Sequence, residues 1–304
     1  MTLIPRWQSV LFLCVAAAAC AAAAAGARLP ARTELLAAAW LIGLVGLPHG
    51  AIDPLLAARV YRIRRPVDWA VFGLRYVALA AVVVMAWFVA PSLFLLGFLI
   101  ISVIHFADDL PPQTLRLSRL VYGATVIVLP TVRYASDTAY LLGLVAGAEA
   151  AAPVTALLQL LAWPLALAAA GLVVIESRRD RRSALDMAAV ALLAALSPPL
   201  VSFTVFFCLM HSLRHLLRAA MSVGGTSVPT LARAARWPLL GTGAVAAAGW
   251  VLLGGQTLDA AVMQLVFVGL AALTLPHMVL VEAAARAGWP LAADLPALRP
   301  ARAS

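Results

Sequence analysis

The sequence predicts an all-α, polytopic integral membrane protein, a helix bundle of about ten (8–10) transmembrane helices. Of its 304 residues, 64% are hydrophobic and 12% are charged, and the mean hydropathy is +0.99. A soluble domain is about half apolar and about a quarter charged, so this composition is typical of a membrane protein. No polar stretch is long enough for a separate soluble domain. We therefore expect residues 1–304 to form a single transmembrane domain.

Each expected helix is an apolar run close to the length needed to cross a bilayer, about 20 residues, with shorter runs tolerated inside bundles. The first, residues 9–27, is rich in alanine. We expect it to be a retained helix rather than a cleaved signal peptide, and the sequence leaves open whether it is peripheral to the bundle. The other expected spans are residues 34–58, 69–90, 92–106, 120–134, 153–175, 184–196, 199–221, 238–253 and 258–285.

Charge patterning orients these spans and excludes one class of partner. The net charge is +9 and all 22 basic residues are arginines, gathered in short clusters beside apolar spans rather than along one face, so we expect no nucleic-acid binding. Arginine clusters follow every even-numbered span, for example at residues 59–65 and 178–182. By the positive-inside bias, these spans end on the cytoplasmic side. We expect the cell (inner) membrane of a bacterial-type cell, with both termini cytoplasmic.

The five histidines of the chain all lie in even-numbered spans. His49 is in the second span, His105 ends the fourth, His211 and His215 are in the eighth, and His277 is in the tenth. Residues four apart share a helix face, so His211 and His215 can point at one atom. Measured from the arginine flanks at 1.5 Å per residue, all five rings are expected within the inner leaflet.

This layer of histidines predicts a metal site. Ionisable groups at membrane depth are costly and mark function, and neutral imidazoles are good ligands for zinc, copper or iron. The alternative is five separate histidines that each hydrogen-bond a neighbouring helix. Asp53 and Asp109 follow His49 and His105 by four residues, a spacing that would let each carboxylate accept the second ring N–H of a ligand on its own helix. Arg214 is expected to be an ordinary flank charge.

Four motifs together resemble a known family. They are Gly46-Leu47-Pro48-His49-Gly50-Ala51-Ile52-Asp53, His105-Phe106, His211-Ser212-Leu213-Arg214-His215 and Leu275-Pro276-His277-Met278. They are similar to those of the bacteriorhodopsin-related (Brp/Blh-like) family of membrane β-carotene 15,15′-dioxygenases. The resemblance runs from the second span to the tenth, and the first and third motifs are the specific ones.

The resemblance implies an Fe(2+) enzyme that cleaves β-carotene at its central double bond with O₂ to give two retinal molecules. The iron ligands implied by position are His49, His105, His211 and His215. His277 lies in a recurrent family motif and is either a further ligand or a residue behind the ligands, like Asp53 and Asp109. No catalytic residue beyond the metal centre is implied. The substrate would be met in the membrane lipid, and retinal would pass to an opsin.

The residues alone leave other functions open. The main alternative is a transmembrane metal-ion transporter, or a metal-binding membrane protein, that uses the same histidine layer. Transport would require polar residues that continue to the outer face, and the outward halves of these spans are apolar. A haem-based electron carrier would need histidines near both faces. A desaturase of the histidine-box type needs about eight histidines, more than this chain has.

Overall fold

The computed structural model describes residues 5–222 and 228–287, and this part of the chain folds into helices with no strands. The predicted polytopic helical membrane protein is confirmed. Within the described ranges, six helical segments are long and apolar enough to cross a membrane, and α6 (Pro91–Ala107) is a shorter apolar helix. The number ten therefore remains a prediction. The six segments are Arg6–Ala24, Ala31–Val60, Pro66–Val89, Ala148–Ser177, Pro199–Arg218 and Leu258–Arg286.

Two of the spans are broken into several helices. The second consists of α2 (Ala31–Leu41), the π-helical turn η1 (Ile42–Gly46), α3 (Pro48–Ala51) and α4 (Asp53–Val60). The eighth consists of α12 (Pro199–Val205), the π-helical turn η2 (Phe206–Ser212) and α13 (Leu213–Ser222). Proline cannot donate a helical hydrogen bond, which explains the breaks before α3, at Pro48, and between α3 and α4, where Pro54 lies in the first turn of α4. π-Helical turns widen a helix locally and are frequent at functional sites.

The remaining helices follow the expected spans with two differences. The expected span 120–134 is divided by Pro130, and α9 has no counterpart among the expected spans. The remaining helices are α1 (Arg6–Ala24), α5 (Pro66–Val89), α7 (Arg116–Val128), α8 (Pro130–Arg133), α9 (Ala135–Ala146), α10 (Ala148–Ser177), α11 (Arg181–Leu196), α14 (Val228–Leu252) and α15 (Leu258–Arg286).

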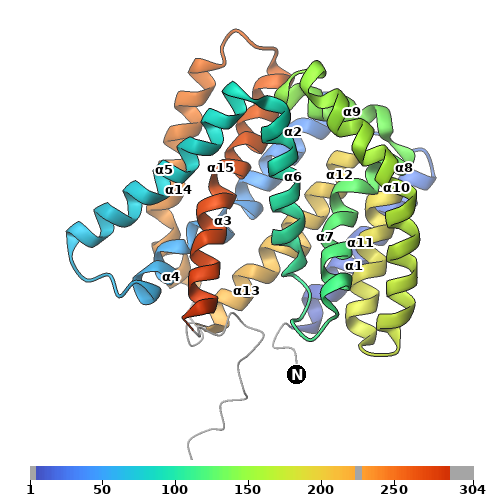
Figure 1. Ribbon diagram of the computed structural model, residues 1–304, viewed down its shortest axis with the longest axis horizontal. Coiled ribbons are helices and arrows are strands. Elements are labelled where there is room, and N and C mark those ends of the chain that lie inside the picture. The colour runs from blue at the N-terminus through green and yellow to red at the C-terminus, as the bar shows by residue number, and fades with distance from the viewer. Residues whose placement is uncertain (1–4, 223–227, 288–304) are drawn as a thin grey trace, which may run out of the picture.

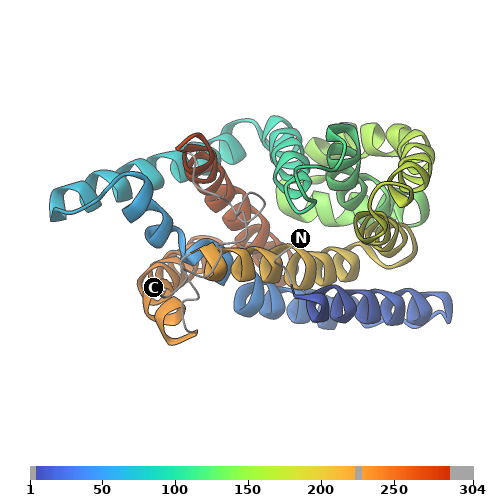
Figure 2. The same cartoon turned by 90° about the horizontal axis from the view of Figure 1, so that it is seen from below.

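The broken eighth span runs through the middle of the bundle. Figure 2 shows α1 and α2 in blue on one side of the molecule, and α6 and α7 in green on the other, with α12 and α13 between them. The two π-helical turns η1 and η2 contact each other, and α1 contacts η2, α11 and α12. In Figure 1, α15 crosses the bundle beside α5. Among the segments that carry histidines, α3 contacts α13 and α15, and α15 contacts α6.

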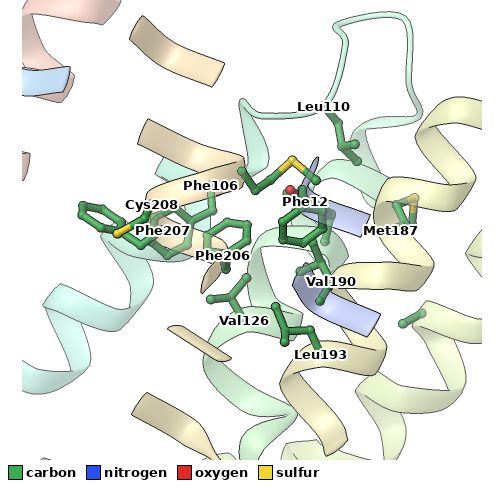
Figure 3. Close-up of a cluster of buried hydrophobic side chains, with 14 of the residues drawn as sticks. Phe12, Phe106, Leu110, Val126, Met187, Val190, Leu193, Phe206, Phe207 and Cys208 are labelled. Carbon is green, nitrogen blue, oxygen red and sulfur yellow. The ribbon is translucent and has the colours of Figure 1, made fainter. Parts of the chain in front are cut away.

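A buried aromatic cluster adjoins the centre of the bundle. Figure 3 shows Phe106 of α6 and Phe206 and Phe207 of η2 together with Phe12 of α1. Phe12 is fully buried. The first span, whose place the sequence left open, therefore packs into the same core as η2.

Helices α6 and α7 approach closely at Gly123, and this contact gives a stability prediction. A Cβ added at Gly123 would collide with the backbone carbonyl oxygen of Val103. Because a backbone atom cannot move aside as a side chain can, Gly123→Ala is expected to destabilise the protein by about 1–3 kcal/mol. Thermal unfolding in detergent measures the effect. Gly97→Ala on α6 is the matched control, since its Cβ would meet nothing within 4 Å, and an equal loss in both variants would contradict the prediction.

Candidate metal centre

The five histidines, far apart in sequence, meet at one point of the bundle. His49 lies in α3, His105 at the end of α6, His211 in η2, His215 in α13 and His277 in α15. The side chains of His49, His105, His211 and His277 are buried, and His215 is partly buried. The predicted convergence of the five rings is thus present in the structure.

The ring separations fit a shared metal ion. His49 is the common neighbour: its ring centroid lies 5.1 Å from His211, 5.5 Å from His277, 5.6 Å from His215 and 6.5 Å from His105. The shortest separation in the cluster, 4.5 Å, is between His105 and His211. A metal–nitrogen bond of about 2.1 Å places a ring centroid about 3 Å from the ion, so rings on one ion have centroids about 4–6.5 Å apart.

One subset of the cluster is especially compact. Ring nitrogens of His49, His105 and His277 all lie within 4.8 Å of one another, close enough to hold one ion. His277 belongs to this subset. The sequence had left open whether this residue is a metal ligand or a residue behind the ligands. His211 and His215 do not belong to this subset, although the rings of both contact the ring of His49.

Two of the histidines are held by carboxylates from other parts of the chain, Asp53 of α4 and Asp109 in the turn after α6. Nδ1 of His277 lies 2.8 Å from Oδ1 of Asp53, and Nδ1 of His211 lies 3.1 Å from both carboxylate oxygens of Asp109. The spacing in the sequence predicted pairs within one helix, His49 with Asp53 and His105 with Asp109. That prediction of partners was wrong. Helical periodicity reports neighbours on one helix, whereas here each carboxylate points across to another helix.

These contacts determine which nitrogen of each ring is available. An ionised carboxylate only accepts hydrogen bonds, so His211 and His277 each donate from Nδ1. In the neutral form of each ring, Nε2 then carries the lone pair, and both Nε2 atoms are buried without a hydrogen-bond partner in the described structure. A buried polar atom normally has a partner, and an acceptor without one in a histidine cluster suits a metal ion. His49 is oriented differently, with Nδ1 2.5 Å from the carbonyl oxygen of Gly46.

Aromatic rings enclose the cluster on one side. Phe207 stacks on His211 with centroids 5.5 Å apart, and Phe106 meets the same ring edge-on at 5.0 Å. Gly46 makes room for this arrangement, because a Cβ there would lie 2.5 Å from the Phe207 ring. Gly46, the first residue of the Gly46–Asp53 motif, thus lets η1 approach η2 closely.

A second layer of polar residues surrounds Asp53 and Asp109, and sequence reasoning missed most of it. The hydroxyl of Tyr76 on α5 donates to Oδ2 of Asp53 at 3.0 Å. Arg214 donates to the backbone carbonyl of Asp109 at 3.3 Å and pairs with Asp186 of α11 at 3.0 Å. Gln8 of α1 accepts from Arg214 at 3.1 Å.

The expectation that Arg214 is a flank charge was wrong, since the residue is 2% exposed. Its partners come from α1, α11 and the end of α6, so no local spacing in the sequence signals them. The only sequence signal is that Arg214 lies inside the His211–His215 motif, three residues after His211 and directly before His215.

The sequence is similar to a known protein family and to two of its named members. A family model described as beta-carotene 15,15'-dioxygenase matches residues 40–284. The chain is 29% identical over 259 residues to the beta-carotene 15,15'-dioxygenase of uncultured marine bacterium 66A03, covering 80% of this chain and 90% of that protein. It is 30% identical over 278 residues to the probable beta-carotene 15,15'-dioxygenase Blh of Halobacterium salinarum, covering 78% and 80%. No solved structure gives a significant match.

The matched region contains every histidine of the cluster and both of its carboxylates, and it leaves α1 outside. The resemblance identified from the sequence motifs is thereby confirmed, together with the assignment to the dioxygenases as a class of enzyme. This chain belongs to the beta-carotene 15,15'-dioxygenase family.

Proposed function

We propose that this protein is an iron(II) enzyme of the membrane that cleaves β-carotene at the 15,15′ double bond with O₂, giving two molecules of retinal. The observation that carries the proposal is the pair of buried Nε2 atoms of His211 and His277, each without a hydrogen-bond partner and each on a ring fixed by a carboxylate. The family and its named relatives support the reaction, and the all-imidazole donor set supports the metal.

The proposed ligands are His49, His105, His211 and His215, with His277 as a further donor. Imidazole suits iron among the first-row metals, and no carboxylate competes for the same position because Asp53 and Asp109 bond to ring N–H groups instead. An iron(II) ion bound here would supply the binding and activation of O₂ that oxidative cleavage of a carbon–carbon double bond requires.

The protein's own residues do three things in this proposal. Asp53 and Asp109 keep the rings of His277 and His211 in the tautomer whose Nε2 faces the centre of the cluster. Phe106 and Phe207 exclude water on one side of that centre. The surrounding apolar helices keep the site within the bilayer, where a C40 hydrocarbon is dissolved.

The test is expression of the protein in cells that accumulate β-carotene, followed by extraction and chromatography. Wild-type protein is expected to remove the orange pigment and produce retinal, and His211→Ala is expected to do neither at an equal protein level. Unchanged β-carotene with well-expressed, iron-loaded wild-type protein would overturn the proposed reaction and favour a metal transporter or a metal-binding membrane protein.

Tyr76 provides a prediction about the layer behind the ligands. Tyr76→Phe removes the hydroxyl that donates to Asp53 and leaves the ring in place. Loss of such an outer hydrogen bond typically costs about 10–100-fold in metal affinity or activity, and we expect iron to dissociate faster by about that factor. Iron release to a chelator measures it. Tyr140→Phe on α9, where the side chain is 55% exposed, is the matched control, and equal release rates in the two variants would contradict the prediction.

We also propose the orientation and the surroundings of the enzyme. The arginines at residues 59–65 and 178–182 lie at helix ends on the side that we assign to the cytoplasm, with the protein in the inner membrane and both termini cytoplasmic. Retinal released into the lipid would pass to an opsin. Single cysteines placed at residues 64 and 255 of a cysteine-free variant are expected to react with an impermeant maleimide from opposite sides of the membrane.

A further inference from the structure

A cavity of about 630 Å³ lies between α5 and α15, outside the ring of histidines. Its walls are mainly apolar, with Val71, Leu79 and Val82 from α5 and Val279 and Leu280 from α15. Ligand-binding cavities typically have volumes of about 300–1,000 Å³ and apolar linings. In size and lining, this cavity is suited to an apolar ligand.

The cavity lies behind the metal centre, and none of the five histidines is among its lining residues. Pro276 lines it, and the next residue on α15 is His277. Tyr76 also lines it, and behind Tyr76 lies Asp53, which accepts hydrogen bonds from the Tyr76 hydroxyl at 3.0 Å and from His277 at 2.8 Å. One wall of the cavity is therefore the outer side of the Asp53–His277 pair.

The cavity also faces outward, toward the region that lipid occupies. Helix α5 has no buried residue along its 24 residues, and Val71 and Val82 are 44% and 62% exposed. Figure 1 shows α5 at the outer edge of the bundle, beside α15. A molecule dissolved in the bilayer can reach this cavity sideways, past the exposed apolar side chains of α5.

Four polar or charged side chains, Tyr61, Asp68, Arg75 and Tyr76, interrupt the apolar walls. The Tyr76 hydroxyl is engaged by Asp53, and Asp68 at the outer end is paired with Arg65 at 3.1 Å. The rest of the lining is apolar, which suits a hydrocarbon chain.

We propose that this cavity, which we call the α5–α15 groove, binds one arm of the carotenoid substrate, an isoprenoid hydrocarbon that enters sideways from the bilayer. The inference rests on the proposed function and adds the place where the substrate is held. Residues Leu79 and Val279, from opposite walls, set the width of the groove. Pro276 and Tyr76 form its inner end, next to His277.

The experiment narrows the groove from each wall with Leu79→Trp and Val279→Trp. Leu74→Trp is the matched control, because Leu74 is on α5, is 72% exposed and does not line the groove. We expect both groove variants to raise KM for β-carotene about tenfold with iron content unchanged, which is the signature of lost substrate binding. The control is expected to stay within about twofold of the wild type.

A second measurement separates this inference from the proposed reaction. Binding of β-carotene to metal-free protein in detergent, followed through the carotenoid absorption band, needs no turnover. Weaker binding in both groove variants than in the Leu74→Trp control would support the groove even if the wild type cleaved nothing. Unchanged binding in both variants would overturn it and leave the groove as a site for membrane lipid.

Discussion

Replacing His277 with alanine is expected to abolish both iron binding and retinal formation. The ring of His277 lies 5.1–5.5 Å from those of His49, His105 and His215, and its Nε2 is buried without a hydrogen-bond partner. Removing it also deprives Asp53 of its histidine partner and leaves a buried carboxylate bonded only to the Tyr76 hydroxyl among the described contacts. We expect the iron content of the purified variant to fall below about a tenth of the wild-type level.

Iron per protein, measured by mass spectrometry, and retinal yield in pigmented cells give the two readouts. Met278→Leu is the matched control, because it changes the neighbouring residue on α15 with little change in volume. Wild-type iron content in His277→Ala would contradict the assignment of His277 as a donor. Loss of iron in the Met278→Leu control as well would show that the effect comes from a general disturbance of α15.

Replacing Asp186 with leucine is expected to cause the largest loss of stability. The carboxylate pairs at 3.0 Å with Arg214, and both side chains are almost completely buried. Removing one partner of such a pair leaves the other charge buried and uncompensated, which costs about 3–5 kcal/mol. Arg214 also donates to the backbone of Asp109, whose carboxylate holds His211, so the loss would reach the metal centre.

Thermal unfolding in detergent, with iron content measured alongside, tests this expectation. The control is Asp68→Asn, which breaks the exposed pair with Arg65 and is expected to change stability by less than about 1 kcal/mol. In the double variant Asp186→Leu with Arg214→Met, no buried charge remains unpaired, and part of the stability should return. A single variant as stable as the wild type would show that water or another group neutralises Arg214.

The sequence predicted the membrane class and the convergence of five histidines, because both depend on patterns within single helices. Hydropathy identifies the apolar spans, and the distance of each histidine from an arginine cluster gives its depth. The partners of Asp53 and Asp109 depend instead on how different helices face one another. Spacing along one helix carries no information about that.

The π-helical turns and the prolines explain part of the difference. They rotate His49 and His211 relative to the residues that follow. A prediction that assumes a regular α-helix therefore assigns those following residues to the wrong helix faces. The environment of the charged residue Arg214 could not be predicted from spacing along one helix either. Its partners Gln8 and Asp186 are contributed by α1 and α11. Asp186 neutralises the arginine and Gln8 accepts a hydrogen bond from it, although the local sequence assigns Arg214 to the membrane flank.

The turn η2 makes the histidine cluster sensitive to chain length. A π-helical turn accommodates one residue more than the α-helical hydrogen-bonding pattern does, so segment 206–212 in effect contains an inserted residue. Deleting one residue there would restore the α-helix and turn the helix on one side of the deletion by about 100° relative to the other. His211 and Phe207 would then no longer face His49 together. Exchanges among apolar residues in this segment preserve the rotation, whereas a single-codon deletion removes it, so the spatial arrangement of the histidines is encoded in residue number as well as in residue identity.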